Sequence, residues 1–315
     1  MSKEIEYKHS LAFNYPDLAK QWDSSKNGTL TPEKVTYGSN KRVWWCLPYD
    51  DAETGRHFEF RWIASIKNRT NNTGCPFLSG KAVWPGFNDL ASKYPDLAKQ
   101  WDIDKNGTLT PEKVRCASGK KVWWYLPYDD AETGRHFDFR WKASISGRTY
   151  DNLGCPFLSG KAVWPGFNDL ASKYPDLAKQ WDSSKNGTLT PEKVTYGSKK
   201  KVWWYLPYDD AETGRHFDFR WKADINSRTS KNIGCPFLSG KAVWPGFNDL
   251  VSRRKYLVED WNWEKNMWKK PEKLFYNSET KIWWKCHICG HVWRMAVFNR
   301  STRGAGCPKY LRHVT

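Results

Sequence analysis

Apolar and polar residues alternate most regularly in the segment around residue 60. Phe58, Phe60, Trp62 and Ala64 would share one face of an extended chain, and the residues between the first three are charged. This two-residue period is typical of a half-buried β-strand. An apolar run at residues 43–45 precedes it, so we expect the two segments to pair as an antiparallel hairpin.

Shorter signals before the hairpin predict helices and turns. Pro16 can open a short helix in which Leu18 and Trp22 share one face. Asn27-Gly28 is a turn dipeptide, and Thr31-Pro32 predicts a helical turn that Pro opens and Thr caps. Helices and a hairpin together indicate an α+β fold.

The whole pattern recurs along the chain. The motif YPDLAKQWD, in full or in a degraded form, begins at Tyr15, Tyr94, Tyr174 and Lys255. The marker tryptophan of each motif advances by 79, 80 and 80 residues, from Trp22 to Trp101, Trp181 and Trp261. Such a fixed period is the signature of a tandem array. We therefore expect four repeats, at 1–83, 84–163, 164–243 and 244–315.

Composition adds a strong positive charge to this picture. Among 315 residues, 51 Lys and Arg stand against 34 Asp and Glu, a net charge of +17. This excess favours a nucleic acid, DNA or RNA, as the partner. No apolar stretch approaches the length of about 18 residues that crosses a bilayer, and the eight cysteines are too scattered for a disulfide scaffold. We expect a cytoplasmic protein with reduced thiols and no membrane contact.

Metal-binding chemistry is concentrated in the last repeat. Cys286 and Cys289 are three residues apart, a spacing at which two thiolates can share one ion, and Cys307 follows. Tetrahedral zinc needs four ligands, and Tyr310 stands where a second pair would place a cysteine. His313 is the first candidate for the fourth ligand and His291 the second. The alternatives are a zinc site with one open coordination position and a repeat without metal.

The order of these motifs resembles a known family. The series xPxLAxxWD, KNGxLTP, VWW, CxxCGHxW, NR[ST] and GCP is similar to the zinc-ribbon (treble-clef-like) repeat family of bacterial proteins, over nearly the whole chain. The resemblance implies a structural zinc in each unit and nucleic-acid binding, often beside nuclease or mobile-element proteins of bacterial or phage origin. It also implies small repeats that each contain a β-hairpin and short helices.

The first three repeats depart from the family pattern at the ligand positions. Leucine occupies the first and last ligand places: Leu47, Leu126 and Leu206, then Leu78, Leu158 and Leu238. Eight more residues separate the Trp pair from the next Trp than in the last repeat. We expect a longer, metal-free hairpin whose tip is shaped by Asp side chains bonded to the turn and by a Gly with positive φ. Zinc is predicted in the last repeat alone.

Basic residues recur at equivalent places and could follow a phosphate backbone. The last 65 residues hold 14 Lys and Arg against 5 Asp and Glu, which is +9 of the total, so we expect this unit to contribute most. A solvated hairpin face or a structural role for the arginines is the alternative. The predicted contacts are Arg69, Arg148, Arg228, Arg300, Lys120, Lys121, Lys200, Lys201, Arg253, Arg254 and Lys255.

Acidic residues at the hairpin tips support a second hypothesis, a scaffold or inhibitor that binds a protein or nucleoprotein. They would repel phosphate but could contact a basic protein. The predicted partner contacts are Asp129, Asp130, Glu132, Asp209, Asp210 and Glu212.

Enzymatic and calcium-binding functions fit the sequence poorly. No nucleophile elbow, phosphate-binding loop or nuclease carboxylate set is present. The stretch from Asp102 to Thr110 imitates a calcium loop, but Lys113 stands where the bidentate carboxylate belongs. We therefore predict a non-enzymatic binding protein.

Overall fold

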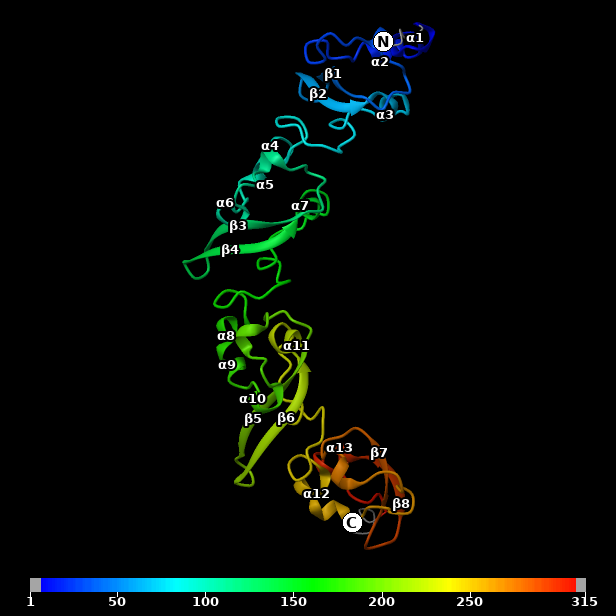
Figure 1. Ribbon diagram of the computed structural model, residues 1–315. Coiled ribbons are helices and arrows are strands. Elements are labelled where there is room, and N and C mark those ends of the chain that lie inside the picture. Colours follow the sequence, from blue (N-terminus) through cyan, green and yellow to red (C-terminus); the bar gives the residue numbers. More distant parts are fainter. Residues whose placement is uncertain (1–6, 310–315) are drawn as a thin grey trace. The chain divides into compact units, whose positions relative to one another are not determined.

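The computed structural model describes residues 7–309, and it divides into two compact units that meet between Pro156 and Phe157. Each repeat contains one two-stranded antiparallel sheet with short helices beside it (Figure 1). The predicted α+β architecture of four small repeats is confirmed.

The first unit contains two hairpins. Its strands are β1 (Arg42–Asp51), β2 (Arg56–Ser65), β3 (Lys121–Asp130) and β4 (Arg135–Ser144). Its helices, with 3-10 turns written η, are η1 (Tyr7–His9), α1 (Leu11–Asn14), α2 (Pro16–Ala19), η2 (Pro32–Lys34), α3 (Ile66–Thr70), α4 (Leu90–Lys93), α5 (Pro95–Ala98), α6 (Ile103–Asn106), η3 (Pro111–Lys113) and α7 (Ile145–Thr149).

The second unit repeats this arrangement. Its strands are β5 (Lys201–Asp210), β6 (Arg215–Asp224), β7 (Lys281–Lys285) and β8 (Val292–Ala296). Its helices are α8 (Leu170–Lys173), α9 (Pro175–Ala178), α10 (Ser183–Asn186), η4 (Pro191–Lys193), α11 (Ile225–Thr229), α12 (Leu250–Arg253), η5 (Lys255–Val258), η6 (Pro271–Lys273) and α13 (Val297–Ser301). The last hairpin has strands of five residues, half the length of the others.

The alternation of apolar residues produces the predicted hairpin. Trp45 pairs with Trp62 and Leu47 with Phe60 across β1 and β2. Trp45 and Phe60 are completely buried, and the residues that flank them along each strand are more exposed. Burying one face of each strand fixes the register, because a slip by one residue would expose these rings.

The hairpin tip also forms as predicted. Asp51 Oδ2 accepts a hydrogen bond from the Thr54 hydroxyl at 2.7 Å, and Asp51 Oδ1 accepts one from the Glu53 amide at 3.3 Å. Gly55 has φ of +67°, which a residue with a Cβ adopts at a cost. The tip is therefore held by its own backbone and by one carboxylate.

The segment before each hairpin covers the outer edge of its first strand. The side chain of Asn27 donates to the Trp44 carbonyl at 2.8 Å and accepts from the Trp44 amide at 2.9 Å. The Cys46 amide donates to the carbonyl of Gln21, and the Asp23 amide donates to that of Trp44. The turn predicted at Asn27 thus has a second role, because its amide group completes the hydrogen bonding of the strand edge. Asn106, Asn186 and Asn266 repeat it.

Short helices begin at defined caps. Pro16 is the first residue of α2, as predicted, and Asp89 caps α4 by accepting from the Ser92 amide at 2.9 Å. The prediction for Thr31 is half correct, because Pro32 opens η2 but the Thr31 side chain makes no capping bond.

Rings fill the space on the buried face of the long hairpins. Phe60 lies 5.3 to 5.5 Å, between ring centroids, from Trp84 and Phe77, and 4.9 Å from Phe87. Such tilted and edge-on contacts stabilise aromatic pairs beyond the effect of burial alone. The same rings recur around Phe219 in the third repeat. The segments that follow the first and third Cys-Pro loops therefore contribute to the core of the repeat before them.

Candidate metal centre and nucleic-acid interface

Three thiols converge in the last repeat. Cys286 and Cys289 flank the turn between β7 and β8, and Cys307 comes from the loop after α13. Their Sγ atoms all lie within 4.8 Å of one another, and those of Cys289 and Cys307 are 3.6 Å apart. The Gly290 amide donates to the Cys286 carbonyl, and the Cys286 amide donates to that of His291, which closes a tight turn around the thiols. We call these three residues the cysteine cluster.

The cysteine cluster has the geometry and chemistry of a zinc site. With zinc–sulfur bonds of about 2.3 Å, tetrahedral ligands lie about 3.8 Å apart, close to the observed spacing. Cys286 and Cys307 are buried, whereas Cys289 is exposed. The predicted fourth ligand, His313, lies outside the described residues. The ring of His291 stacks on Trp293 with centroids 5.9 Å apart.

His287, the remaining histidine of the motif, is engaged elsewhere. Its amide and its Nδ1 both contact Asp260 Oδ1, at 2.8 and 2.6 Å. Burial would raise the pKa of Asp260, but hydrogen bonds from His287 and Arg300 outweigh it and hold the pKa below its usual value. The same contact raises the pKa of His287. This carboxylate therefore ties the metal-binding turn to the helix that follows it.

In the first repeat, rings and an aliphatic chain stand in the places of the ligands. Leu47 packs against the core at the position of Cys286, and Cys75, equivalent to Cys307, is buried among the rings. Phe58 and Phe60, which replace the metal-binding turn, are stacked with centroids 5.7 Å apart. Hydrophobic packing thus joins the hairpin to the Cys-Pro loop, and the metal-free state of the first three repeats stays a prediction.

Four arginines predicted to contact phosphate are buried. Arg148 is 4% exposed and lies between two indoles, with its guanidinium carbon 4.9 Å from the Trp124 ring and 5.1 Å from that of Trp141. Its Nη2 donates to Gln100 at 2.6 Å. The same environment surrounds Arg69, Arg228 and Arg300.

Burial makes these arginines structural. It lowers the pKa of Arg69 and Arg148, and it lowers that of Arg228 to about 10. Arg300 differs from the others because its Nη2 is 2.6 Å from a carboxylate, that of Asp260. We correct the sequence prediction accordingly: Arg69, Arg148, Arg228 and Arg300 join elements within their own repeats and do not present a cationic surface.

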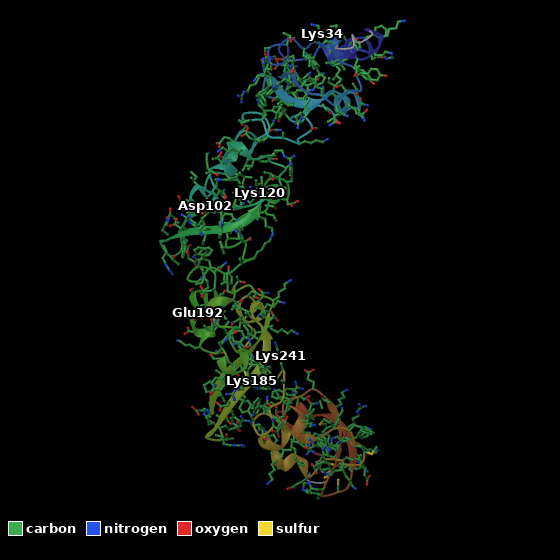
Figure 2. The ribbon with its side chains drawn as sticks, viewed as in Figure 1. Lys34, Asp102, Lys120, Lys185, Glu192 and Lys241 are labelled. Atoms are coloured by element: carbon green, nitrogen blue, oxygen red, sulfur yellow. The ribbon has the colours of Figure 1, made fainter. Side chains whose placement is uncertain are left out.

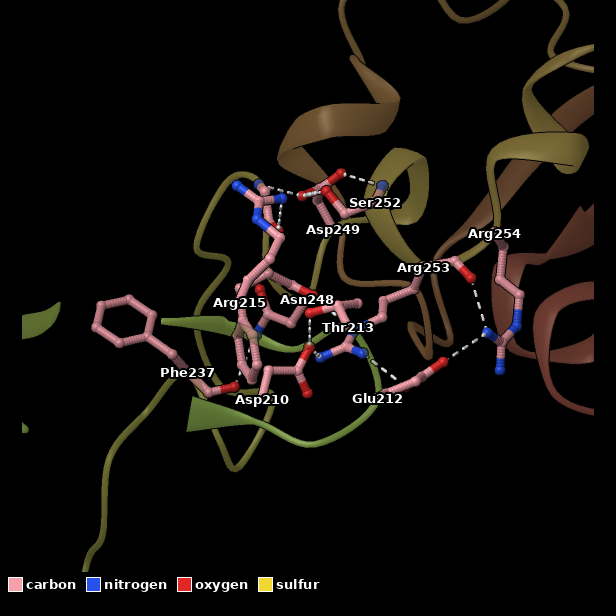
Figure 3. Close-up of polar contacts among 12 residues, drawn as sticks. Asp210, Glu212, Thr213, Arg215, Phe237, Asn248, Asp249, Ser252, Arg253 and Arg254 are labelled. Carbon is pink, nitrogen blue, oxygen red and sulfur yellow. Dashed lines mark hydrogen bonds and ion pairs between the residues drawn. The ribbon is translucent and has the colours of Figure 1, made fainter. Parts of the chain in front are cut away.

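Two further predicted contacts are occupied by the acidic hairpin tip of the third repeat (Figure 3). Arg253 Nη2 lies 2.9 Å from Asp210 Oδ2, and its Nη1 lies 2.5 Å from Glu212 Oε2. Arg254 Nη1 is 3.9 Å from Glu212 and its Nε donates to the Ser301 carbonyl. The structure therefore pairs Arg253 and Arg254, predicted to bind nucleic acid, with Asp210 and Glu212, predicted to bind a partner protein.

This tip contact also occurs in the first unit, where Glu53 Oε2 lies 2.7 Å from Lys93 Nζ of α4. At the second tip, Asp130 is buried and its side chain accepts hydrogen bonds from Glu132 and Thr133. Asp129 and Asp209 remain about 89% exposed. The tips thus serve intramolecular contacts first, and only their outermost carboxylates face solvent.

The exposed tip histidines give a pH-dependent prediction. Asp129 Oδ1 lies 2.6 Å from His136 Nδ1, and this hydrogen bond, with a second to Asp138, raises the pKa of His136. Since the folded pKa is above the unfolded one, the pair stabilises the tip below about pH 6.5 and that contribution is lost as the pH rises through the folded pKa. We expect Asp129→Asn to lower the His136 pKa in an NMR titration. Asp96→Asn, at a distant surface pair, should leave it unchanged, and an unchanged value in Asp129→Asn would contradict the assignment.

The predicted lysine contacts are accessible. Lys120, Lys121, Lys200, Lys201 and Lys255 are all exposed. Lys120 lies just before β3, beside the hairpin of the second repeat (Figure 2). Four of them lie at the start of a hairpin, at β3 and β5, and Lys255 begins η5.

A larger group of exposed cations was not predicted as a contact. Around Trp268, which is 92% exposed, the last repeat presents six basic side chains that we call the basic face: Lys265, Lys269, Lys270, Lys273, Lys281 and Arg294. None forms an ion pair with another residue in the range 7–309. The signal was present in the sequence, because Met267-Trp268-Lys269-Lys270 replaces the Gly-Thr-Leu-Thr of the other repeats.

Two hollows adjoin Trp268. One of about 450 Å³ is lined by Trp268 with Lys269, Lys270 and Lys273, and a second of about 160 Å³ is lined by Trp268 with Lys281 and other residues. No helix among the described residues is long and apolar enough to cross a membrane.

A comparison with known families accounts for the repeats. No curated protein matches the chain. A family model described as "Probable Treble clef zinc finger domain" matches it four times, at residues 18–80, 97–160, 177–240 and 257–309. Each match includes one hairpin, and the last includes the cysteine cluster, which supports zinc binding there. The chain therefore belongs to the treble clef zinc finger family and carries four tandem copies of its domain.

Proposed function

We propose that this protein is a non-enzymatic nucleic-acid-binding protein that contacts the phosphate backbone mainly through the basic face of its last repeat. The family supports binding to nucleic acid or protein in general. The observation that favours nucleic acid is the basic face itself, in which six exposed cations surround two hollows. When lysines and arginines neutralise phosphates, the counterions condensed on the nucleic acid are released, and this release provides most of the affinity of backbone binding.

The surroundings of the basic face support this assignment. Glu264, Glu272 and Glu279 belong to the same segment, but they line neither hollow. Arg253 and Arg254, although cationic, are neutralised by the third hairpin tip and are left out of the interface. Lys120, Lys200 and their neighbours would extend the contact to the other repeats.

We propose a non-enzymatic function because the metal-binding chemistry of the described residues is structural. Within residues 7–309, the grouping of possible metal ligands is the cysteine cluster, and a tetrahedral thiolate zinc stabilises a fold. The pair of His136 and Asp129 is exposed at a hairpin tip, whereas sites for small-molecule substrates are usually clefts that bury most of the ligand.

A salt titration tests the proposed function. We expect the zinc-bound chain to bind a fluorescent 20-nucleotide probe at 50 mM salt and to lose on the order of 10³-fold in affinity by 200 mM, as about six phosphate contacts require. The triple variant Lys269→Glu, Lys270→Glu, Lys281→Glu should abolish this binding in an anisotropy assay.

A charge-matched control separates the basic face from the net charge. Lys34, Lys67 and Lys81 are exposed in the first repeat, so their triple change to Glu alters the charge equally. It should reduce affinity only slightly. Equal losses in both variants, or affinity that does not depend on salt, would contradict the proposal. A protein partner that survives nuclease treatment and is released by charge reversal at Asp129 and Asp209 would favour the protein-binding hypothesis instead.

A further inference from the structure

The segment 267–270 of the last repeat differs in sequence and in contacts from its equivalents in the first three repeats. In the first three repeats the indole N–H of the marker tryptophan donates to the carbonyl of a leucine, from Trp22 to Leu30 at 3.1 Å, for example. Leu30 packs against the core of its repeat. In the last repeat an exposed Lys269 stands at the leucine position, and the buried Nε1 of Trp261 has no hydrogen-bond partner in the described part of the chain. A core contact has thus been replaced by exposed side chains.

The segment 267–270 and the nearby Trp263 expose large apolar side chains to solvent. Trp268 is 92% exposed, Met267 71% and Trp263 60%. A single exposed ring is unremarkable in a soluble protein, but three large apolar side chains within six residues form a patch, and a patch rimmed by charge marks a binding surface. The charged residues that line the two hollows beside Trp268 are all basic, so the partner has flat apolar groups joined by negative charges.

The position of Trp268 favours a single-stranded nucleic acid over a duplex. Its side chain lines both hollows, with Lys270 and Lys273 beside one and Lys281 beside the other. An unpaired base can stack on an exposed indole while the phosphates on either side reach the flanking lysines. A duplex cannot do so, because its bases are already stacked and present only their edges.

We infer that the last repeat binds single-stranded nucleic acid, with a base stacked on Trp268 and the adjoining phosphates held by Lys269, Lys270 and Lys281. This inference rests on the proposed function and adds the preferred form of the nucleic acid. The lysines provide affinity for any polyphosphate, whereas Trp268 provides the preference for unpaired bases.

The chain offers a matched variant for the test. Thr29, Thr108 and Thr188 occupy the position of Trp268 in the other repeats, so Trp268→Thr places a residue that this fold accepts. Trp268→Phe keeps a ring and should restore binding. Tyr256→Ala removes a ring that is 61% exposed in the same repeat and lines neither hollow.

Three probes of equal length separate stacking from charge: a single-stranded 15-mer, its duplex and an abasic strand of the same phosphate number. The zinc-bound full chain should prefer the single strand, and Trp268→Thr should weaken that complex about 10- to 100-fold. The duplex and abasic complexes should change less than about twofold, since stacking is absent from both. Tyr256→Ala should resemble the unaltered chain with every probe.

The outcomes distinguish the two proposals. Binding of all three probes with no effect of Trp268→Thr overturns the single-strand inference and leaves the proposed function standing. Failure of every probe to bind the unaltered chain overturns both. A dimer that dissociates on Trp268→Thr would assign the patch to a second copy of the chain and would also overturn the inference.

Discussion

Removal of zinc is expected to unfold the last repeat and to leave the first three folded. The cysteine cluster joins the β7–β8 turn to the loop after α13, and the core beside these five-residue strands lacks the Phe rings that pack on the long hairpins. Binding of structural zinc contributes about 10–16 kcal/mol in isolated fingers, more than the stability of a small repeat. Hydrogen exchange after chelation should show loss of protection confined to residues 250–309. Metal analysis should give one zinc per chain.

Cysteine variants provide the control for this prediction. Cys286→Ser should lose the metal and the protection together. Cys116→Ser, at a half-buried thiol of the second repeat, should keep both. Zinc retained by Cys286→Ser, or more than one zinc in the unaltered chain, would contradict the assignment. His291→Ala and His313→Ala then show which histidine completes the site, because only the ligand's loss should weaken zinc binding.

Replacing Arg300 by alanine is expected to be the most damaging change at a residue outside the cysteine cluster. Arg300 and Asp260 are each 7% exposed in side chain and 2.6 Å apart. Removing the cation leaves the buried carboxylate with His287 alone beside it, and breaking a buried ion pair typically costs about 3–5 kcal/mol. Arg300 also fills the space between Trp284 and Trp293, so its loss opens a cavity. Native-state hydrogen exchange of the β7 amides measures this loss for the one repeat.

The other repeats supply the comparison. Arg148 occupies the same position but bonds a neutral Gln100, so Arg148→Ala leaves no buried charge and should destabilise its repeat by less than Arg300→Ala does. Asp260→Gln gives the last repeat the Arg–Gln contact of the other three repeats. It should therefore destabilise the repeat by less than Arg300→Ala does. Equal losses in Arg148→Ala and Arg300→Ala would show that packing between the indoles, rather than the buried charge, dominates.

The sequence predicted features whose causes are local. Alternation at Phe58, Phe60 and Trp62 set the face of β2, and the tip formed around Asp51 and Gly55 because turn chemistry depends on neighbouring residues. The pairing of Cys286 with Cys289 followed from spacing, since two thiols three residues apart meet in one turn whatever the rest of the fold does.

Features that depend on distant residues were missed. Arg148 reads as a surface charge until Trp124, Trp141 and Gln100 close around it, and its hydrogen-bond partner is 48 positions away. The pairing of Arg253 with the third tip has the same cause, because charges from separate repeats neutralise each other only once both have folded. The exposure of Trp268 escaped notice for the opposite reason, since a tryptophan in a tryptophan-rich chain is normally assigned to the core.

The asparagine that caps the outer edge of each first strand bears on how nearly identical neighbours fold beside one another. Adjacent copies share their strand sequences, so an open strand edge in one could recruit the matching strand of the next, producing swapped or fibrous chains. Asn27 and the backbone at Gln21 and Asp23 already bond Trp44 and Cys46 from within the same copy. The outer strand edge of each copy is therefore already hydrogen-bonded within that copy. Duplication of the segment adds a repeat without adding an open strand edge that could pair with its neighbour.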